Sequence, residues 1–402
     1  MNEFNNLGLS NELLTAIQEF GFEKPTDIQQ KTIPSIILGK DVIGESSTGS
    51  GKTLAFGCGI VEKVDHGKGL QALILTPTRE LAEQVKGVLN RLSNKKTLNI
   101  VAVYGGVSIG PQIHNLSKAD VLVATPGRLL DHLQRKTTDI SKIKLLVLDE
   151  ADRMLDMGFI DDLKRIIHYC PKKRQTLLFS ATITQRVKNL AKQYTEDPNL
   201  IFSRRYVDPD KLKQVYYNIE RNLKLPLLVH LLQNEKSGLV MVFCNTRRNT
   251  DFVTKSLRAN KINTFAIHGG LSQNKRIDTI NLFNKSKIMV LVCTDVASRG
   301  LDIDSVSHIY NYDIPKDAKD YVHRIGRTAR AGEDGKVINI LCDYDHDNFS
   351  RITHEYPKFV IEKADRPYLK QIIAVKVDRE RIPMHYRRKG NSYSRRIHKR
   401  YD

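Results

Sequence analysis

A glycine-rich loop near the start of the chain has the composition of a phosphate-binding site. Residues 46–53, SSTGSGKT, follow the apolar segment DVIG and precede a segment typical of a helix. In loops of this kind backbone N–H groups surround phosphate oxygens, while Lys52 can reach the β- and γ-phosphates and the Thr53 hydroxyl can ligate Mg²⁺. Ser46 replaces the first glycine of the general pattern. The loop predicts a nucleoside triphosphate site.

An acidic tetrad about 100 residues further on supplies the groups that such a site needs for hydrolysis. The apolar run LLVL ends in Asp149, Glu150, Ala151 and Asp152. At the end of a buried strand, Asp149 can hold Mg²⁺, mostly through water, and Glu150 can orient and deprotonate the attacking water. A lone tetrad is often a solvated surface, but its place after GKT favours catalysis. We therefore predict Thr53 and Asp149 as metal ligands.

The tetrad and its flanks carry a resemblance to a known family. The segment reads DEAD and continues as RMLDMGF over residues 153–159. From about Phe4 to about Cys342 the chain resembles the DEAD-box RNA helicases of superfamily 2. The resemblance implies two tandem RecA-like domains, ATP and Mg²⁺ as ligands, and RNA-stimulated ATP hydrolysis coupled to unwinding of short duplexes or remodelling of RNA–protein complexes.

The residues around Gln29 resemble the adenine-reading Q motif of that family. A Gln amide offers a donor and an acceptor to the adenine edge, and Phe4, 17 residues before Gly21, can stack on the base. Asp302, in a segment that resembles motif V, is the implied ribose contact. The ATP-binding residues implied are Phe4, Phe22, Thr26, Gln29, Thr48, Gly49, Ser50, Gly51, Lys52, Thr53 and Asp302.

The segment HRIGRTAR, residues 323–330, resembles motif VI, where the family carries its arginine fingers. Arginine fingers neutralise charge on the transferring phosphoryl group. Arg327 and Arg330 stand three apart, so a helical turn would present both on one face. Ala329 stands where the family usually has glycine. The implied catalytic set is Lys52, Asp149, Glu150, Arg327 and Arg330, and the implied coupling set is Asp152, Ser180, Thr182 and His323.

The remaining matches gather Thr, Gly and Arg residues at predicted strand ends. Backbone amides and short hydroxyls bind phosphates without reading bases, which predicts sequence-independent RNA binding. The implied RNA-binding residues are Pro77, Thr78, Arg79, Gly105, Gly106, Thr125, Pro126, Gly127, Arg128, Asn245, Thr246, Arg247, His268, Gly269, Thr294, Arg299 and Gly300, followed in the second half by Gly270, Gln273 and Arg276.

Apolar runs that alternate with helical patterns must position these residues. Six runs precede Leu200 and five lie between Leu239 and Leu341, the rhythm of two parallel sheets flanked by helices. We therefore predict an α/β fold of two RecA-like domains, residues 1–205 and 214–360. The polar, proline-containing stretch SRRYVDPDKLK gives the linker, residues 206–213, and residues 361–402 are predicted to form a flexible basic tail.

Composition fits a polyanionic partner. The 402 residues carry a formal charge of +19, and residues 366–402 alone hold 12 Lys/Arg against 3 Asp/Glu, a balance of 12 − 3 = +9. Neutralising phosphates releases counterions, so such charge favours nucleic acid. Tyrosines in the tail can stack on bases, although the tail can also simply be solvated. The five cysteines are scattered, and the sequence contains no long apolar run and no signal pattern. We therefore predict a cytoplasmic protein. We also expect it to be monomeric.

Two other functions use the same residues. An ATP-gated RNA clamp would turn over little, but such a scaffold could lose Glu150 or an arginine finger, and both are present. A DNA translocase is disfavoured by the Q motif and the DEAD tetrad. Within the family, the compact core and short basic tail suggest the bacterial RhlE-type group, which would act around ribosomal RNA.

Overall fold

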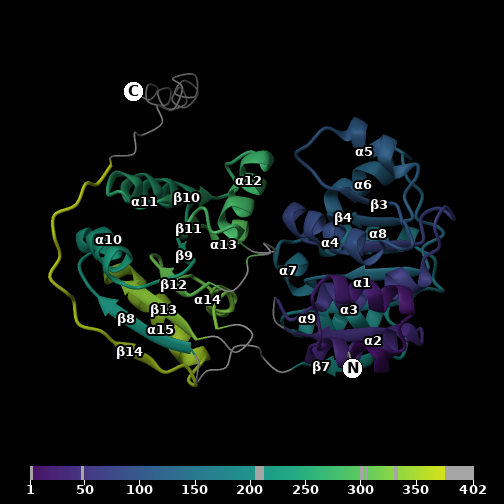
Figure 1. Cartoon of the computed structure of the whole chain (residues 1–402), viewed down its shortest axis with the longest axis horizontal. Coiled ribbons are helices and arrows are strands. Elements are labelled where there is room, and N and C mark those ends of the chain that lie inside the picture. The colour runs from purple at the N-terminus through teal and green to yellow at the C-terminus, as the bar shows by residue number, and fades with distance from the viewer. Residues whose placement is uncertain are drawn as a thin grey trace, which may run out of the picture.

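The chain forms two lobes, each built on a seven-stranded sheet in which the described strand pairings are all parallel (Figure 1). The structure is a computed structural model that describes residues 3–46, 49–203, 212–298, 303, 306–329 and 334–375. Within these residues no helix is both long and apolar enough to cross a membrane.

The first sheet has the strand order β3-β4-β2-β5-β6-β1-β7. Its central strands are short apolar runs such as ALIL and LLVL, which are buried on both faces because helices cover both sides. The strands are β1 (Val42–Glu45), β2 (Ala72–Leu75), β3 (Ile100–Val103), β4 (Val121–Ala124), β5 (Leu145–Leu148), β6 (Gln175–Ser180) and β7 (Asn199–Phe202).

Two layers of helices sandwich this sheet. Alternate side chains of each strand point to opposite faces, so Leu73 and Leu75 pack under α6–α9 while Ala72 and Ile74 pack under α2–α4. The elements are η1 (Glu3–Leu7), α1 (Asn11–Glu19), α2 (Asp27–Ile37), α3 (Lys52–Lys63), α4 (Arg79–Leu92), α5 (Ile109–Leu116), α6 (Pro126–Gln134), α7 (Ala151–Asp156), α8 (Ile160–Tyr169) and α9 (Gln185–Tyr194).

The second sheet repeats the first. Its order, β10-β11-β9-β12-β13-β8-β14, is the first order with each strand number raised by seven. Its strands are β8 (Leu212–Asn218), β9 (Val240–Phe243), β10 (Thr264–Ile267), β11 (Val290–Cys293), β12 (His308–Asn311), β13 (Gly335–Leu341) and β14 (Ile361–Lys363). Two equivalent RecA-like units, as predicted, therefore account for the fold.

Helices again cover both faces of the second sheet. Met241 and Phe243 pack with α12–α15, whereas Val240 and Val242 pack with α10 and α11. The elements are η3 (Arg221–Leu223), α10 (Lys224–Asn234), α11 (Arg247–Ala259), α12 (Gln273–Asn284), α13 (Asp295–Ser298), α14 (Ala318–Ile325), η4 (Asp343–Asp345) and α15 (His346–Glu355).

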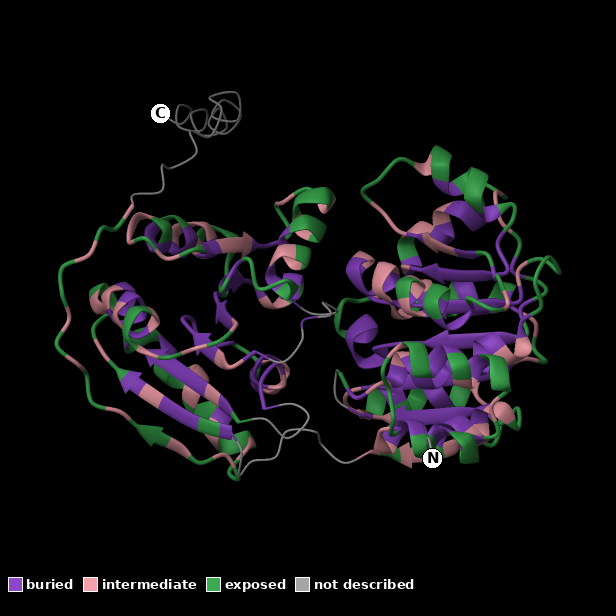
Figure 2. Cartoon of the chain, in the orientation of Figure 1, coloured by how far each residue is buried: buried purple, intermediate pink, exposed green. Residues whose placement is uncertain are grey.

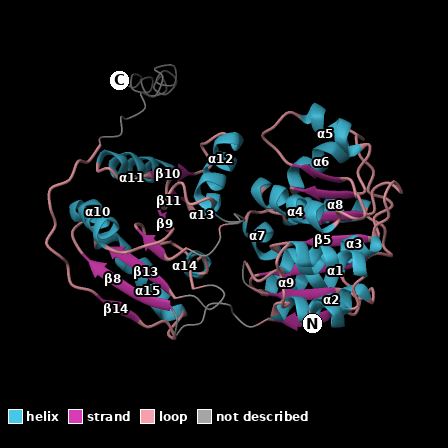
Figure 3. Cartoon of the chain, in the orientation of Figure 1, coloured by secondary structure: helices cyan, strands magenta, loops and turns pink. Residues whose placement is uncertain are grey.

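Burial follows this layering in both lobes. The central strands are buried and the outer faces of the helices are exposed (Figure 2). Figure 3 shows the same strands and helices coloured by secondary structure. The eleven strands predicted from apolar runs all form: β1–β6 in the first sheet and β9–β13 in the second. Predicted site residues stand at or just beyond the carboxyl ends of nine of them, β1–β6 and β9–β11.

The predicted domain boundaries differ from the structure at both ends of the second lobe. Strand β8 begins at Leu212, inside the expected linker, and residues 204–211 lie outside the described ranges. Strand β14 begins at Ile361, where the basic tail was expected to start, and pairs with β8. Residues 364–375, here called the strap, continue along the outside of this lobe (Figure 1). Ordered pairing and packing, rather than a free tail, thus extend to Val375.

Candidate functional site

Three loops meet at one edge of the first sheet. The glycine-rich loop follows β1, the acidic tetrad follows β5, and residues Ser180–Thr182 follow β6. These three strands are neighbours in the order β5-β6-β1, and parallel strands present their carboxyl ends at one edge. The backbone amide of Ser46 donates to the carbonyl of Ser180 at 3.0 Å. The structure therefore brings the predicted phosphate and acid residues together.

The glycine-rich loop has the backbone that a phosphate cradle requires. Gly49 and Gly51 have φ values of 79° and 90°, a region that favours glycine. Lys52 begins α3, and its buried ammonium donates to the carbonyl of Ser46 at 2.8 Å. The hydroxyls of Ser46 and Ser50 lie 2.8 Å apart. Lysine and backbone amides at a helix start form a site suited to polyphosphate.

The Q-motif residues Thr26 and Gln29 form hydrogen bonds with the backbone of this loop. Gln29 accepts from the backbone amide of Thr26 at 2.9 Å and donates to the carbonyl of Gly51 at 3.1 Å. The Thr26 hydroxyl donates to the carbonyl of Ser50 at 2.7 Å. A Cβ atom at Gly51 would overlap the Gln29 side chain. Gln29 therefore links α2 to the loop, and its amide retains one donor and one acceptor site for a base.

The two aromatic residues expected near adenine lie in different environments. Phe4 is fully buried in the cluster that η1 forms with α1 and α3. Its ring contributes to the packing of the amino-terminal turn, and its contact with adenine stays a prediction. Phe22 is 45% exposed and stacks on Phe20, with ring centroids 5.6 Å apart.

The acidic residues occupy a sharp bend between β5 and α7. Asp149 is buried and accepts from the backbone amide of Glu150 at 3.0 Å. Burial raises the pKa of Asp149 to about 7, while the charge of Lys52 opposes the rise. Glu150 has a φ of 52° and forms an ion pair with Arg153 at 3.1 Å. A non-glycine residue in this conformation is strained, a feature that gathers at functional sites.

The predicted link between Asp152 and the segment Ser180–Thr182 is present. One oxygen of Asp152 accepts from the backbone amide of Thr182 at 3.0 Å and from its hydroxyl at 2.9 Å. The Ser180 hydroxyl accepts from the amide of Asp152 at 3.3 Å and donates to the carbonyl of Thr182 at 2.8 Å. The acidic tetrad and the end of β6 therefore move as one unit.

Of the two expected arginine fingers, the structure describes Arg327, which lies beyond the end of α14. Helix α14 ends at Ile325, and Arg327 lies in the turn that follows, where it is buried. Ala329 has a φ of 52°, which is incompatible with a right-handed helix. His323 occupies the last turn of α14. Thr48, Arg299, Gly300, Asp302 and Arg330 lie outside the described residues.

Arg324 is a functional residue that the sequence analysis did not single out. It is fully buried and binds both carboxylate oxygens of Asp295, at 2.6 and 2.7 Å. It also donates to Asn245 at 2.9 Å and to the carbonyl of Asp313 at 2.6 Å. One guanidinium thus ties together the ends of β9, β11 and β12. Its place inside the matched segment HRIGR was the signal that could have revealed it.

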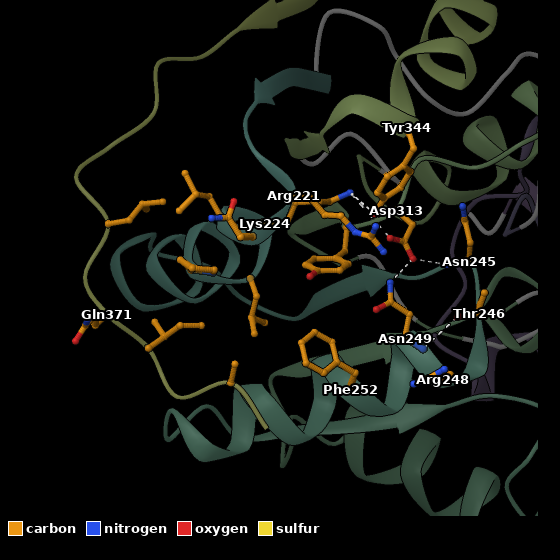
Figure 4. Close-up of a pocket in the computed structure, with 18 of the residues that line it drawn as sticks. Arg221, Lys224, Asn245, Thr246, Arg248, Asn249, Phe252, Asp313, Tyr344 and Gln371 are labelled. Carbon is orange, nitrogen blue, oxygen red and sulfur yellow. Dashed lines mark hydrogen bonds and ion pairs between the residues drawn. The ribbon is translucent and has the colours of Figure 1, made fainter. Parts of the chain in front are cut away.

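Ten of the twenty residues predicted to bind RNA line one groove between the lobes. The groove has a volume of about 520 Å³. The first lobe contributes Pro77, Thr78, Arg79, Glu80, Gly105, Thr125, Gly127 and Arg128, and the second contributes Gly269, Leu271, Gln273, Arg276, Val296 and Ala297. Asn245 and Thr246 instead line a separate cavity of the second lobe (Figure 4).

The two lobes build their halves of this surface in the same way. Thr78 caps α4 and Thr246 caps α11, each through its hydroxyl. The next residue is an arginine that packs against a glycine pair: a Cβ at Gly106 would overlap Arg79, and a Cβ at Gly269 would lie 3.0 Å from Arg247. Gly106 also has a φ of 78°, which favours glycine, whereas at Gly269 a Cβ would meet only the end of the Arg247 side chain.

The other predicted RNA residues lie at strand ends or helix starts. Pro126 is the first residue of α6, buried at the amino end where its missing N–H costs nothing. Thr294 follows β11, and its amide donates to the carbonyl of Ile267 at 3.3 Å. His268 follows β10 and binds Asp251 at 2.9 Å.

Polar contacts between described residues join the lobes directly. Arg276 of α12 forms an ion pair with Glu80 of α4 at 2.8 Å, and both side chains are largely buried. Burial lowers the pKa of Arg276, and Glu80 opposes that change. Arg153 donates to the carbonyl of Val296 at 3.2 Å, so the ion-pair partner of Glu150 also reaches the second lobe.

Comparison with known proteins assigns both lobes. Residues 26–190 match the DEAD/DEAH box helicase family, and residues 223–332 match the helicase conserved C-terminal domain. The chain is 45% identical over 352 residues to ATP-dependent RNA helicase CshA of Limosilactobacillus reuteri, covering 86% of this chain and 71% of that protein. It is 44% identical over 344 residues to CshA of Geobacillus kaustophilus, covering 85% and 74%. These relatives are named CshA, so the expected RhlE-type subgroup is not supported.

Solved structures show the same fold with different lobe arrangements. A DEAD box protein from Methanococcus jannaschii is 42% identical, covers 90% of this chain and 99% of its own, and has a TM-score of 0.56. A point variant of Saccharomyces cerevisiae Dbp5 bound to RNA and ADP BeF3 is 31% identical, covers 90% and 96%, and has a TM-score of 0.80. The same variant bound to nup159, a gle1 variant, IP6 and ADP scores 0.63. The variant bound to the gle1 variant and IP6 scores 0.75, so structures of one protein differ in their similarity to this chain.

Proposed function

The chain belongs to the DEAD-box family of ATP-dependent RNA helicases, and from this premise we propose how its own residues divide the work. ATP binds at the edge formed by β5, β6 and β1, and RNA lies in the groove between the lobes. Closure of the lobes on both ligands completes the catalytic site, and hydrolysis releases them. One chain supplies both halves, which supports a monomer as the working unit.

The residues at the nucleotide site fit Mg-ATP. Lys52 and the amides that begin α3 are placed for the β- and γ-phosphates, and the Thr53 hydroxyl and the Asp149 carboxylate are the proposed metal ligands. No cluster of three or more His, Cys, Asp or Glu side chains that could hold a metal occurs among the described residues. Such a sparse donor set suits Mg²⁺, which usually keeps several waters and takes its other ligands from phosphates. When bound, the ion would neutralise charge on the transferring phosphoryl group.

Glu150 is the proposed base, and the second lobe is proposed to complete the site. Glu150 projects from the bend beside Asp149 and can take the proton of the attacking water. Arg327 and Arg330 are the proposed fingers, worth about 10³ to 10⁵ in rate where they have been removed from related reactions. Since they come from the other lobe, hydrolysis should depend on closure.

The groove supports a grip on the RNA backbone rather than on bases. It offers hydroxyls, backbone amides of glycines and two guanidinium groups, Arg79 and Arg128, from the first lobe. Such groups contact phosphates and sugars. A strand held by both lobes would be bent on closure, which separates it from a partner strand and so melts a short duplex.

The ion pair between Arg276 and Glu80 is the observation that carries the proposal. It joins two residues that line the proposed RNA groove, one from each lobe. The complete groove therefore forms only when the two lobes are closed. Any ligand that binds the completed groove must favour the closed arrangement by its differential affinity.

ATP hydrolysis with and without a short single-stranded RNA tests this function. We expect RNA to raise the rate at least tenfold, and Glu150→Gln to reduce the stimulated rate about 10² to 10⁴-fold while ATP-dependent RNA binding persists. Glu83→Gln, on α4 in the same lobe, is the matched control. Equal hydrolysis with and without RNA would contradict closure-gated catalysis.

One observation favours a clamp that turns over little. In the present arrangement Arg153 holds Glu150 at 3.1 Å, which competes with a water for the carboxylate. If this pair persists with both ligands bound, the protein would hold RNA without rapid hydrolysis. Duplex release under ATP by the unmodified protein, absent in Glu150→Gln, would exclude the clamp. Retention of the duplex by both would support it.

A further inference from the structure

The second lobe contains a cavity that the RNA groove does not include. It has a volume of about 1330 Å³ and lies at the carboxyl edge of the second sheet (Figure 4). Its walls are the start of α10, the loop from β9 into α11, the residues after β12, and Tyr344 of η4. Small-ligand sites usually measure about 300 to 1,000 Å³, so this cavity is larger than one small molecule needs.

The strap closes the outer side of the cavity and is fixed to the lobe. Asn260 of α11 donates to the carbonyl of Ile373 at 2.8 Å and accepts from its amide at 3.1 Å. The amide of Val375 donates to the Ser256 hydroxyl at 3.2 Å. Leu369 and Ile372 pack on the core formed by α10 and α11. The wall is therefore a built part of the lobe.

Charge in the cavity is strongly positive. Arg221, Arg248, Lys316 and Lys370 are exposed at its walls, and none of them forms an ion pair with another described residue. The one acid in the lining, Asp313, already accepts from Asn245 and Asn249 at 2.9 and 2.6 Å.

A fifth cation in the lining, Lys224, forms its ion pair inside the core of the lobe. It is buried and binds Asp345 at 2.7 Å, so its charge is balanced within the protein. The other four charges face the cavity without a described counter-ion. A polyanion would supply the missing charge.

Aromatic faces accompany these cations. Tyr344 is 48% exposed, with the Arg221 guanidinium over its ring at 5.3 Å, and Phe252 is half-buried on the opposite wall. Exposed rings beside basic groups form the surface on which single-stranded nucleic acid binds, because bases stack on the rings while cations hold phosphates. A small anion or an acidic peptide would not need the rings.

We propose that this cavity binds the single-stranded flank of the RNA whose core lies in the inter-lobe groove. This proposal rests on the proposed function and extends it. Thr246 lines the cavity and is followed by Arg247, which packs on the Gly269 that lines the groove, so a strand leaving the groove over α11 reaches the cavity.

Charge reversal in the cavity tests the proposal. The full chain with Arg221→Glu, Lys316→Glu and Lys370→Glu is compared with a control triple, Lys213→Glu, Lys236→Glu and Lys287→Glu, whose exposed residues lie at the opposite, amino edge of the sheet. Both triples change the net charge equally. Binding is measured to a short single strand that fills only the groove and to the same strand with a long flank.

We expect the cavity triple to weaken binding of the flanked RNA about tenfold or more at low salt, and to leave the short RNA within about twofold of the control. The slope of log affinity against log salt should fall by roughly 2 in magnitude for the flanked RNA, about 0.7 for each lost phosphate contact. Tyr344→Ala should weaken the flanked RNA about fivefold or more, and Tyr344→Phe should not, since a phenyl ring also stacks.

Two results would overturn the proposal. Equal losses on both RNAs would mean that the triple acts on general electrostatics, and no loss beyond the control would leave the cavity to an acidic protein or a small anion. RNA-stimulated ATP hydrolysis with the short RNA is a separate readout. If the unmodified protein lacks it, the proposed function fails whatever the flank does.

Discussion

Two residues of the candidate site adopt the left-handed backbone conformation that favours glycine. Glu150 has a φ of 52° at the start of α7, and Ala329 has the same φ after α14. An L-residue in this region costs about 1 to 2 kcal/mol. At Glu150 the bend turns the proposed base away from the axis of β5. Ala329 lies beyond the end of α14 at Ile325, and its left-handed conformation explains why glycine is usual at this position in the family.

Ala329 allows a direct test of that cost. Glycine removes the strain but also removes a buried methyl group worth about 0.8 kcal/mol, so Ala329→Gly should change the free energy of unfolding by less than about 1 kcal/mol. Ala329→Val should destabilise by about 1 to 3 kcal/mol, because a branched side chain fits neither the conformation nor the space beside Gly335. Urea unfolding of the two variants measures both values. A glycine variant weaker than the valine variant would show that the methyl contact, and not strain, dominates.

At this scale the sequence located the right segments but assigned some roles differently from the structure. The loop, the tetrad and the residues after β6 meet as predicted because strand ends fix them. The complete burial of Phe4 was not predicted, since burial depends on neighbours that a local pattern does not include. Arg324 was overlooked for the same reason: its partners Asn245 and Asp295 lie 79 and 29 residues away.

At the scale of elements, the two lobes share a local arrangement of side chains as well as a strand order. In each lobe the strand next to the sheet centre is followed by a threonine cap and an arginine, and the arginine packs on glycines that follow the outermost strand. The pairs are Arg79 with Gly106 and Arg247 with Gly269. The repetition implies that each lobe offers RNA the same kind of backbone-binding surface.

The strands that the sequence did not predict are all at one side of a sheet. Strand β7 ends the order of the first sheet, and β8 and β14 end the order of the second sheet. Strands β7 and β14 are edge strands, and at least half of the residues in each are exposed. Edge strands need no continuous apolar run, so hydrophobic periodicity detects them poorly. Strand β14 has three residues, IEK, and its position is decided by pairing with β8.

Pairing of β14 and the strap with the second lobe predicts a local loss of protection on truncation. A chain ending at residue 360 loses the β14 ladder and the packing of Leu369 and Ile372, whereas a chain ending at 375 keeps both. Hydrogen exchange of the β8 amides should therefore accelerate at least tenfold in the shorter chain and stay near the full-length rate in the longer one. Similar exchange in all three chains would show that the strap does not protect this edge.

At the scale of the whole molecule, lobe arrangement is the variable that matters most. Two structures of one Dbp5 variant, at the same 31% identity, differ in TM-score to this chain by 0.80 − 0.63 = 0.17. Sequence cannot account for that difference, so it reflects how the lobes sit. The sequence of this chain predicted two lobes and their loops, but their relative placement depends on contacts between residues far apart in the chain, such as Arg153 with Val296, 143 positions apart, and Glu80 with Arg276, 276 − 80 = 196 positions apart.

A charge swap across the lobes tests whether those contacts govern closure. Arg276→Glu or Glu80→Arg alone leaves two like charges in a largely buried interface, which should cost about 2 to 5 kcal/mol of closure and lower RNA-stimulated hydrolysis at least tenfold. The double variant restores an attractive pair and should recover part of the loss, whereas Lys275→Glu, an exposed neighbour of Arg276, should have little effect. Energy transfer between one dye on each lobe, with ATP and RNA present, reports closure separately from chemistry. If closure is normal in both single variants while hydrolysis falls, the pair acts on the RNA or the nucleotide and not on the arrangement of the lobes.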